Sequence, residues 1–344
     1  MSAPPGVVRL AAGLDRRARL RLAAAVVALA VVTFLALRLI TDWRHLPGEV
    51  AHFFHLDPRP LIAAWVIQTV GWLIVVDTWR RIVGHGAAAL RLPLLRHMQV
   101  YAYTSLTQVL PGSIWQPMSR IALYRQLGVP AMTVSAAVVM EWMMLGVAGL
   151  VLYAVAAPFS RAVPPGWLPL LGLVALAALT LLHPTVFRLA LRRAAHWLRQ
   201  AAPPVAPAMR AQTGWLARET LVLACSGVGL YLLMGALTPA ASLPDAMAAW
   251  GLSLAVASLL AWLPATALLK DGSMVLLLTP VYSDLAGDTG TAALIALGLV
   301  LAWRIWSVAV LLSWAALATV AARRLPLPTA GAAEVSADHA EPAA

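Results

Sequence analysis

The sequence predicts an all-α polytopic membrane protein with about six full spans and two re-entrant helical hairpins in an inverted-repeat arrangement. Of its 344 residues, 61% are hydrophobic and only 11% are charged, and the mean hydropathy is +0.81. Soluble domains average roughly 45–50% apolar and about 25% charged residues. Too little polar surface remains to cover a soluble core, so a soluble globular enzyme is excluded, as are disordered and disulfide-scaffold classes.

The distribution of basic residues predicts the topology. The formal net charge is +11, and the arginines stand in short groups between apolar runs. With the expected spans, 19 of the 25 basic residues fall on one side and three on the other. This is the positive-inside pattern, which places both ends of the chain in the cytoplasm and argues against nucleic acid as a partner.

The expected organisation is a cytoplasmic basic N-terminus (1–21), a single transmembrane domain (22–322) and a disordered cytoplasmic tail (323–344). Full spans are expected at 22–37, 60–76, 131–157, 166–182, 220–244 and 290–322. A helix needs about 20 residues to cross the hydrocarbon core. Each run has about this length, or reaches it when neighbouring residues are included.

Two segments are interrupted by proline and favour re-entrant hairpins. Residues 97–119 contain no Asp, Glu, Lys or Arg, have Pro111-Gly112 near their middle, and are flanked by arginine on both sides. Residues 245–288 are broken at Pro264 and must begin and end on the outer side. Hairpins that enter from opposite faces are typical of inverted-repeat transporters, which place a binding site near the midplane.

Four charged residues at or near membrane depth are candidate site residues. Glu141 and Arg304 lie well inside expected spans, and Lys270 and Asp271 adjoin the Pro264 break. A charge at a helix centre costs about 2.5–3.5 kcal/mol on insertion scales, so each needs a reason. One hypothesis is a site for a charged headgroup or a proton relay. The other is a structural ion pair, for example Glu141 with Arg304, or Lys270 with Asp271.

The first proline break suggests a phosphate site. If a half-helix begins after Pro111-Gly112, its amides and dipole could hold a phosphate, with Arg120 adding a charge-assisted hydrogen bond. Gln108 and Gln116 place further polar groups there. The alternative is a kinked helix whose Arg120 snorkels to the interface.

Other residues favour packing or surface roles over chemistry. Many tryptophans stand near expected span ends, which predicts an aromatic belt: Trp43, Trp79, Trp167, Trp215 and Trp250. Gly227-Val228-Gly229 is typical of a close-packing site between helices. His52, His55 and Asp57 are interpreted as a solvated loop and not as a metal site, and Cys225 is the single cysteine.

Two motifs resemble those of the lysylphosphatidylglycerol synthase transmembrane (flippase-like) family, over roughly Trp79 to Trp314. The first motif reads Leu110-Pro111-Gly112-Ser113, Arg120 to Arg125, Leu127-Gly128-Val129, Ala136 and Glu141. The second reads Leu263-Pro264 and then Lys270-Asp271-Gly272-Ser273-Met274-Val275, with Arg304 in the last helix. Lys270 stands where the family more often has arginine, and Ala265–Leu269 lacks the usual glycines.

The resemblance implies a bacterial inner-membrane protein that moves an anionic, aminoacylated, polyprenyl-linked or hopanoid-type lipid between leaflets. The chain has no room for an aminoacyl-transferase domain, so a stand-alone flippase without enzymatic activity is expected. Two alternatives stay open: a membrane enzyme acting on a lipid-linked substrate, and a non-transporting partner of lipid-synthesis enzymes. Membrane lipids are the expected partners, and no metal or other cofactor is expected.

Overall fold

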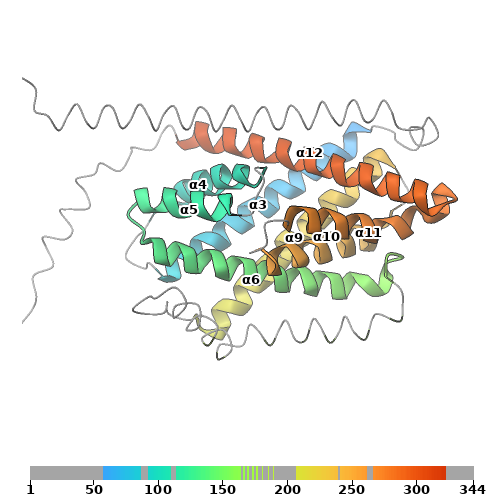
Figure 1. Ribbon diagram of the computed structural model, residues 1–344. Helices are drawn as coiled ribbons and strands as arrows, with labels where there is room; N and C mark the ends of the chain where they lie inside the picture. The colour runs from blue at the N-terminus through green and yellow to red at the C-terminus, as the bar shows by residue number, and fades with distance from the viewer. Residues whose placement is uncertain are drawn as a thin grey trace, which may run out of the picture. The chain divides into compact units, whose positions relative to one another are not determined.

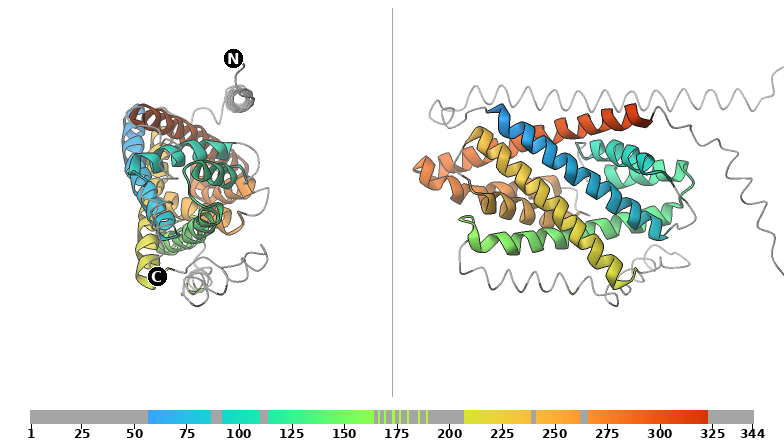
Figure 2. Two further views of the ribbon diagram at one scale, coloured as in Figure 1. Left: turned by 90° about the vertical axis from the view of Figure 1, so that its left-hand side faces the viewer. Right: turned by 180° about the vertical axis from the view of Figure 1, so that it is seen from behind.

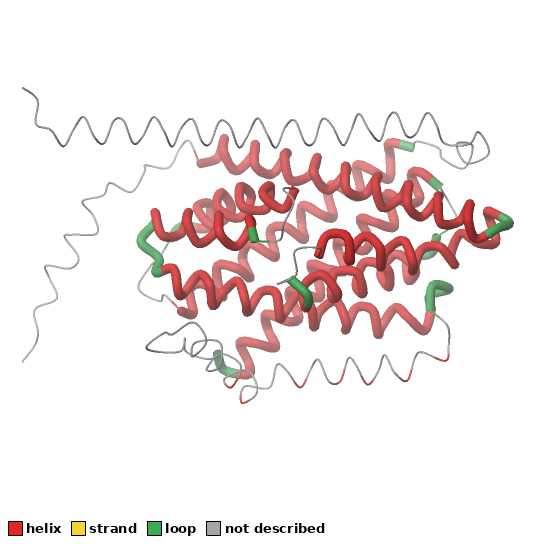
Figure 3. The backbone as a smooth tube through the Cα atoms, viewed as in Figure 1, coloured by secondary structure: helices red, strands yellow, loops and turns green. Residues whose placement is uncertain are grey.

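The computed structural model describes residues 57–86, 92–109, 114–163, 207–238, 241–261 and 266–322, with isolated positions between 166 and 189. The chain divides into two compact units, Met1–Ala51 and His52–Ala344, and every described residue belongs to the second. Within the described ranges all regular structure is helical, as the tube in Figure 3 shows.

Eight α-helices and two short 3₁₀ helices make up this part of the chain (Figure 1). They are α3 (Pro58–Gly86), α4 (Leu94–Leu106), η1 (Thr107–Val109), α5 (Trp115–Gln126), α6 (Ala131–Ala156), η2 (Ala157–Phe159), α9 (Met209–Leu237), α10 (Leu243–Leu259), α11 (Thr266–Ala286) and α12 (Thr289–Ala322). Among them α3, α6 continued by η2, α9 and α12 are long and apolar enough to cross a membrane. The predicted class of an all-α membrane protein is therefore confirmed.

The four helices overlap the spans expected at 60–76, 131–157, 220–244 and 290–322, and two are longer than predicted. The expected end of the third span is wrong, because α9 ends at Leu237 and residues 243–244 already belong to α10. Helix α3 continues to Gly86 and α9 begins at Met209, because charged residues end an apolar run without ending a helix. The expected spans at 22–37 and 166–182 lie outside the described residues, apart from isolated positions in the second. The predicted termini at 1–21 and 323–344 lie outside them as well.

The most extensive helix contacts in the described bundle are those of α3 with α9, α6 with α10, and α11 with α12. Helix α4 also packs along α12. The view from behind in Figure 2 shows α3 and α9 running side by side. The short helix α5 packs against α4 and α6, its neighbours in the chain. Helix α11 likewise packs against its chain neighbours, α10 and α12.

Glycines allow the closest helix contacts. A Cβ atom on Gly149 of α6 would lie 2.5 Å from the carbonyl oxygen of Gly251 in α10, so neither position tolerates a side chain without movement. The predicted close packing at Gly227 and Gly229 is confirmed, since a Cβ on Gly229 would lie 2.5 Å from the amide nitrogen of Gln68. Small residues at such contacts let helix backbones approach in a membrane, where no hydrophobic driving force brings helices together.

Helix breaks occur where the two prolines predicted them. Helix α4 ends at Leu106 and α5 begins at Trp115, so the chain reverses around Pro111-Gly112, which itself lies outside the described residues. Helix α10 ends at Leu259 and α11 begins at Thr266. The segments α4–α5 and α10–α11 are thus two helical hairpins whose arms pack on each other.

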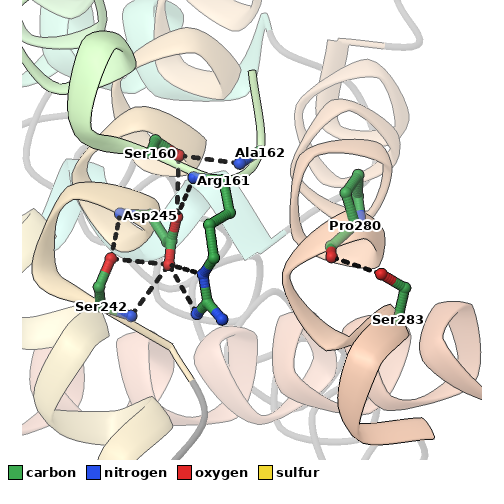
Figure 4. A network of polar contacts seen from close by, with 7 residues as sticks. All are labelled: Ser160, Arg161, Ala162, Ser242, Asp245, Pro280 and Ser283. Carbon is green, nitrogen blue, oxygen red and sulfur yellow. Dashed lines mark hydrogen bonds and ion pairs between the residues drawn. The ribbon is translucent and has the colours of Figure 1, made fainter. Parts of the chain in front are cut away.

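One proline does not end its helix, since α11 continues through Pro280 to Ala286. Proline has no backbone N–H, so the Leu276 carbonyl lacks its helical donor. Hydroxyl groups on either side of Pro280 bond to carbonyls of their own preceding turns. Thr279 Oγ1 donates to the Val275 carbonyl at 2.8 Å, and Ser283 Oγ donates to the Pro280 carbonyl at 2.8 Å (Figure 4).

A buried aspartate ties the end of η2 to the start of α10. Ser242 and Asp245 form a capping box at the α10 N-terminus. Asp245 Oδ1 also accepts hydrogen bonds from Ser160 Oγ at 2.9 Å and from the Arg161 backbone N–H at 2.8 Å (Figure 4). The Arg161 guanidinium pairs with Asp245 Oδ2 at 3.0 Å. One carboxylate therefore joins two chain segments that are 84 residues apart in sequence.

We expect Asp245→Asn to lower the free energy of unfolding by about 1–2 kcal/mol at neutral pH, because a cap and a charged partner are lost. Burial opposes the charge, but hydrogen bonds from Ser242 and Arg161 outweigh it and hold the Asp245 pKa below its ordinary value. The stabilisation is therefore complete above about pH 4, the unfolded value, and disappears as the pH falls through the folded pKa.

Thermal unfolding in detergent at several pH values measures this difference. Asp284→Asn is the matched control, since Asp284 is exposed near the end of α11. A variant that unfolds like the wild type at neutral pH would contradict the structural role of Asp245.

Candidate functional site

A buried ion pair joins the first hairpin to the following long helix. Arg120 of α5 is 1% exposed and Glu141 of α6 is 2% exposed. Arg120 Nη1 donates to Glu141 Oε2. Arg120 therefore does not snorkel to the interface, and the alternative of a kinked helix with a snorkelling arginine is wrong.

Aromatic and hydroxyl groups complete the surroundings of this pair. The guanidinium carbon of Arg120 lies 4.3 Å from the ring centroids of both Trp79 and Tyr101. The Tyr101 hydroxyl donates to Glu141 Oε1 at 2.9 Å, and Arg120 Nε donates to Thr104 Oγ1 at 3.3 Å. Aromatic faces stabilise a desolvated cation, so the site is built to keep Arg120 charged away from water.

A second set of hydrogen bonds holds these rings in place. Trp79 Nε1 donates to the Tyr124 hydroxyl at 2.8 Å, and His97 Nδ1 lies 2.6 Å from the same oxygen. The hydroxyl of Tyr124 thus links α3 and α4 to α5. Sequence reasoning singled out none of Trp79, Tyr101, Tyr124 or His97 for this site, because each contact joins residues of different helices.

The aromatic belt prediction is wrong for three tryptophans. Trp79, Trp215 and Trp250 are buried inside the protein and do not form an interfacial belt. Their positions near the ends of apolar runs were misleading, because an indole also serves as a partner for buried polar groups. Trp43 and Trp167 lie outside the described residues.

Glu219 of α9 is a further buried carboxylate that the sequence analysis missed. It is fully buried, and no described residue donates a hydrogen bond to either of its oxygens. It interacts electrostatically with Glu141 and Arg120. It directly precedes the span expected at 220–244, so it was not considered at membrane depth. Because α9 begins at Met209, helical spacing from Gln212 and Trp215 places Glu219 on the buried face of the helix.

A second ion pair joins the other hairpin to the last helix. Arg304 Nε of α12 contacts Asp271 Oδ2 of α11, with side chains 40% and 19% exposed. Both pairings suggested by the sequence are therefore wrong, because Glu141 pairs with Arg120 and Asp271 pairs with Arg304. Lys270 instead lies with its Nζ 5.6 Å from the ring centroid of Trp250. The ring of Trp250 makes an edge contact with Trp303 at 5.2 Å.

Two of the remaining predicted site residues, Gln108 and Gln116, lie within the described part of the chain. Gln108 is exposed on η1, and Gln116 is half-buried in the first turn of α5, where its carbonyl accepts a hydrogen bond from Ser119. Pro111 and Gly112 lie outside the described residues, as do His52 and His55. Within the described ranges no group of three or more His, Cys, Asp or Glu residues could hold a metal ion.

Long apolar helices with polar side chains gathered between them define an all-α integral membrane protein. Comparisons with known proteins do not assign the chain to a family within this class. The chain matches no family model, and no curated protein or solved structure is significantly similar to it.

Proposed function

We propose that the chain is a lipid-transport protein of the flippase type, which moves a lipid with a charged headgroup across a bacterial inner membrane. The observation that carries this proposal is the pairing of two helical hairpins, each joined to the next long helix by an ion pair. Buried charges inside a membrane bundle are expensive and are typical of transport pathways.

The helix contacts support an inverted repeat. A first set (α3, α4, α5, α6) and a second set (α9, α10, α11, α12) have the same order of long helix, hairpin and long helix. In this correspondence α3 matches α9, α4 matches α10, α5 matches α11 and α6 matches α12. The contact of α4 with α12 then has its counterpart in the contact of α10 with α6, and the α3–α9 contact is its own counterpart. The signs of the ion pairs are opposite: the hairpin supplies Arg120 in the first set and Asp271 in the second.

In this proposal both hairpins are re-entrant. The α4–α5 hairpin enters from the cytoplasmic side, where arginines flank it, and α10–α11 enters from the outer side. Six full spans would then include the two expected in parts of the chain beyond the described residues. The motif resemblance to the flippase-like transmembrane family of lysylphosphatidylglycerol synthases agrees with this topology, as do cytoplasmic termini.

The chemistry of the two sites suits a phospholipid headgroup. A phosphate needs a cation, and Arg120 Nη2 has no hydrogen-bond partner among the described residues. Lys270, the single lysine of the chain, lies beside half-exposed Arg304. An amine on the headgroup could meet Glu141 or Asp271. This chemistry suits an anionic or aminoacylated headgroup, and the motif resemblance adds polyprenyl-linked or hopanoid-type lipids to the proposed classes.

The test is lipid movement in proteoliposomes that carry fluorescent phosphatidylglycerol or cardiolipin analogues. The wild type should move at least one of them, and Lys270→Gln should slow this movement by about tenfold, which is the loss of one charge-assisted hydrogen bond of about 1.5 kcal/mol. Lys270 suits this test because none of the ion pairs between described residues depends on it.

Asp284→Asn, reconstituted at the same protein-to-lipid ratio, is the control and should move lipid at the wild-type rate. If folded wild-type protein moves no anionic analogue faster than empty liposomes do, the lipid-transport proposal is wrong. If Lys270→Gln moves lipid at the wild-type rate, Lys270 does not contact the headgroup.

A further inference from the structure

The fully buried Glu219 carboxyl needs a neutralising partner. Both of its oxygens are shielded from solvent, and no described residue donates to them. An ionised carboxylate without a hydrogen bond or a counter-ion is among the most costly groups to bury, and such groups neutralise instead. A neutral acid at the same place costs far less.

The charge balance around Glu219 leads to the same conclusion. Two carboxylates, Glu141 and Glu219, share the field of one guanidinium, that of Arg120. Arg120 is committed to Glu141 through Nη1 and to Thr104 through Nε, while its Nη2 has no partner among the described residues. When two carboxylates share a site with one cation, one of them retains its proton.

No other charged group on the neighbouring helices substitutes for a proton. The helices packed against α9 carry these charged or imidazole groups: Glu141 on α6, Arg59, Asp77, Arg80, Arg81 and His85 on α3, Asp245 on α10 and Arg304 on α12. Arg59 lies in the first turn of α3, near Asp57, whose backbone N–H bonds the Ala236 carbonyl at the far end of α9 from Glu219. Asp77 pairs with Arg80, Arg81 and Arg218, and Arg304 pairs with Asp271. His85 packs edge-on against Trp215. Among the described residues, no ion pair includes Glu219.

Asp245 acts at the other end of α9. Glu219 lies 18 residues before the last residue of α9, about 27 Å along the helix axis. Asp245 stands in the first turn of α10, which follows that end, and is already bonded to Ser242 and Arg161. It therefore neither supplies nor withdraws charge at Glu219.

We propose that Glu219 is a proton-binding site, occupied in this conformation by an exchangeable proton. The carboxyl is the neutral acid while Arg120 pairs with Glu141. Loss of the proton to water requires the site to open to solvent, or Arg120 to turn its unbonded Nη2 toward Glu219. The inference rests on burial and charge balance and does not depend on lipid transport.

Infrared spectroscopy of the full-length protein in detergent tests this directly. The wild type at neutral pH should show the C=O stretch of a protonated carboxylic acid, which should shift when glutamate is ¹³C-labelled. Glu219→Gln should remove the band, whereas Asp284→Asn, a change at an exposed carboxyl, should retain it. A folded wild type without the band, or a band that persists in folded Glu219→Gln, would overturn the proposal.

Two further measurements keep the test decisive. Glutamine matches a protonated glutamate in shape and charge, so Glu219→Gln should unfold within a few degrees of the wild type in detergent. If Glu219→Gln unfolded at a much lower temperature than Glu141→Gln, Glu219 would act as an ion, which would contradict the proposal. Replacing choline chloride by sodium chloride should leave the band unchanged, and loss of the band would assign the site to sodium.

Discussion

Arg120→Met should lower the free energy of unfolding by about 3–5 kcal/mol, the usual cost of removing one partner from a buried ion pair. The substitution leaves the Glu141 carboxylate buried without its cation. It also empties the space between the rings of Trp79 and Tyr101, each 4.3 Å from the guanidinium carbon. The expected result is a large loss of folded protein, measured by size-exclusion chromatography and thermal unfolding in detergent.

A double-mutant cycle separates the pair from the space that it fills. Glu141→Gln alone should destabilise the protein, and Arg120→Met combined with Glu141→Gln should recover part of the loss, because no unpaired charge stays buried. Arg304→Met is the comparison, since its ion pair with Asp271 is half-exposed and worth about 1 kcal/mol or less. Equal effects at Arg120 and Arg304 would contradict the special environment of the first pair.

The contrast between the two ion pairs also bears on transport. The Arg120–Glu141 pair is sealed by aromatic rings and hydroxyls, while Arg304 and Lys270 are partly exposed. A headgroup can reach a half-exposed cation without breaking the fold. We therefore expect transport defects with little loss of stability at Lys270, and loss of stability first at Arg120.

Much of the fold could be predicted because it depends on local patterns. Four apolar runs became the four long helices, and both hairpin turns fall where Pro111 and Pro264 interrupt the sequence. Proline cannot donate a backbone hydrogen bond, so its effect on a helix is readable from the chain itself. Proline alone does not decide a helix end, however, because α11 continues through Pro280 to Ala286.

The candidate site was harder to predict because it depends on which helices meet. Arg120, Glu141, Asp271 and Arg304 were each singled out, since a charge in an apolar run is costly wherever it lies. Their partners were not, because pairing depends on the packing of the hairpins against α6 and α12. Glu219 was overlooked because it stands one residue before the span expected at 220–244, while α9 begins ten residues earlier, at Met209.

The α6–α10 contact leads to the second large effect. Gly149→Leu should lower the free energy of unfolding by about 3 kcal/mol, because overpacking moves atoms that have no room. Even a Cβ at Gly149 would lie 2.5 Å from the Gly251 carbonyl oxygen and 3.0 Å from the Ala255 backbone nitrogen. Both atoms are backbone, so only separation of α6 from α10 relieves the overlap.

Gly235→Leu is the matched control, because Gly235 is exposed on α9 and a Cβ there meets no atom within 4 Å. It should be neutral or slightly stabilising, since leucine favours a helix over glycine. Gly149→Ala and Gly251→Ala should give intermediate losses, the latter because a Cβ on Gly251 would lie 2.8 Å from the Gly149 carbonyl oxygen. Because α6 also carries Glu141, its displacement from α10 should weaken the contact with Arg120, and Gly149→Leu should combine less than additively with Arg120→Met. Wild-type unfolding of Gly149→Leu in detergent would show that α6 and α10 do not approach this closely.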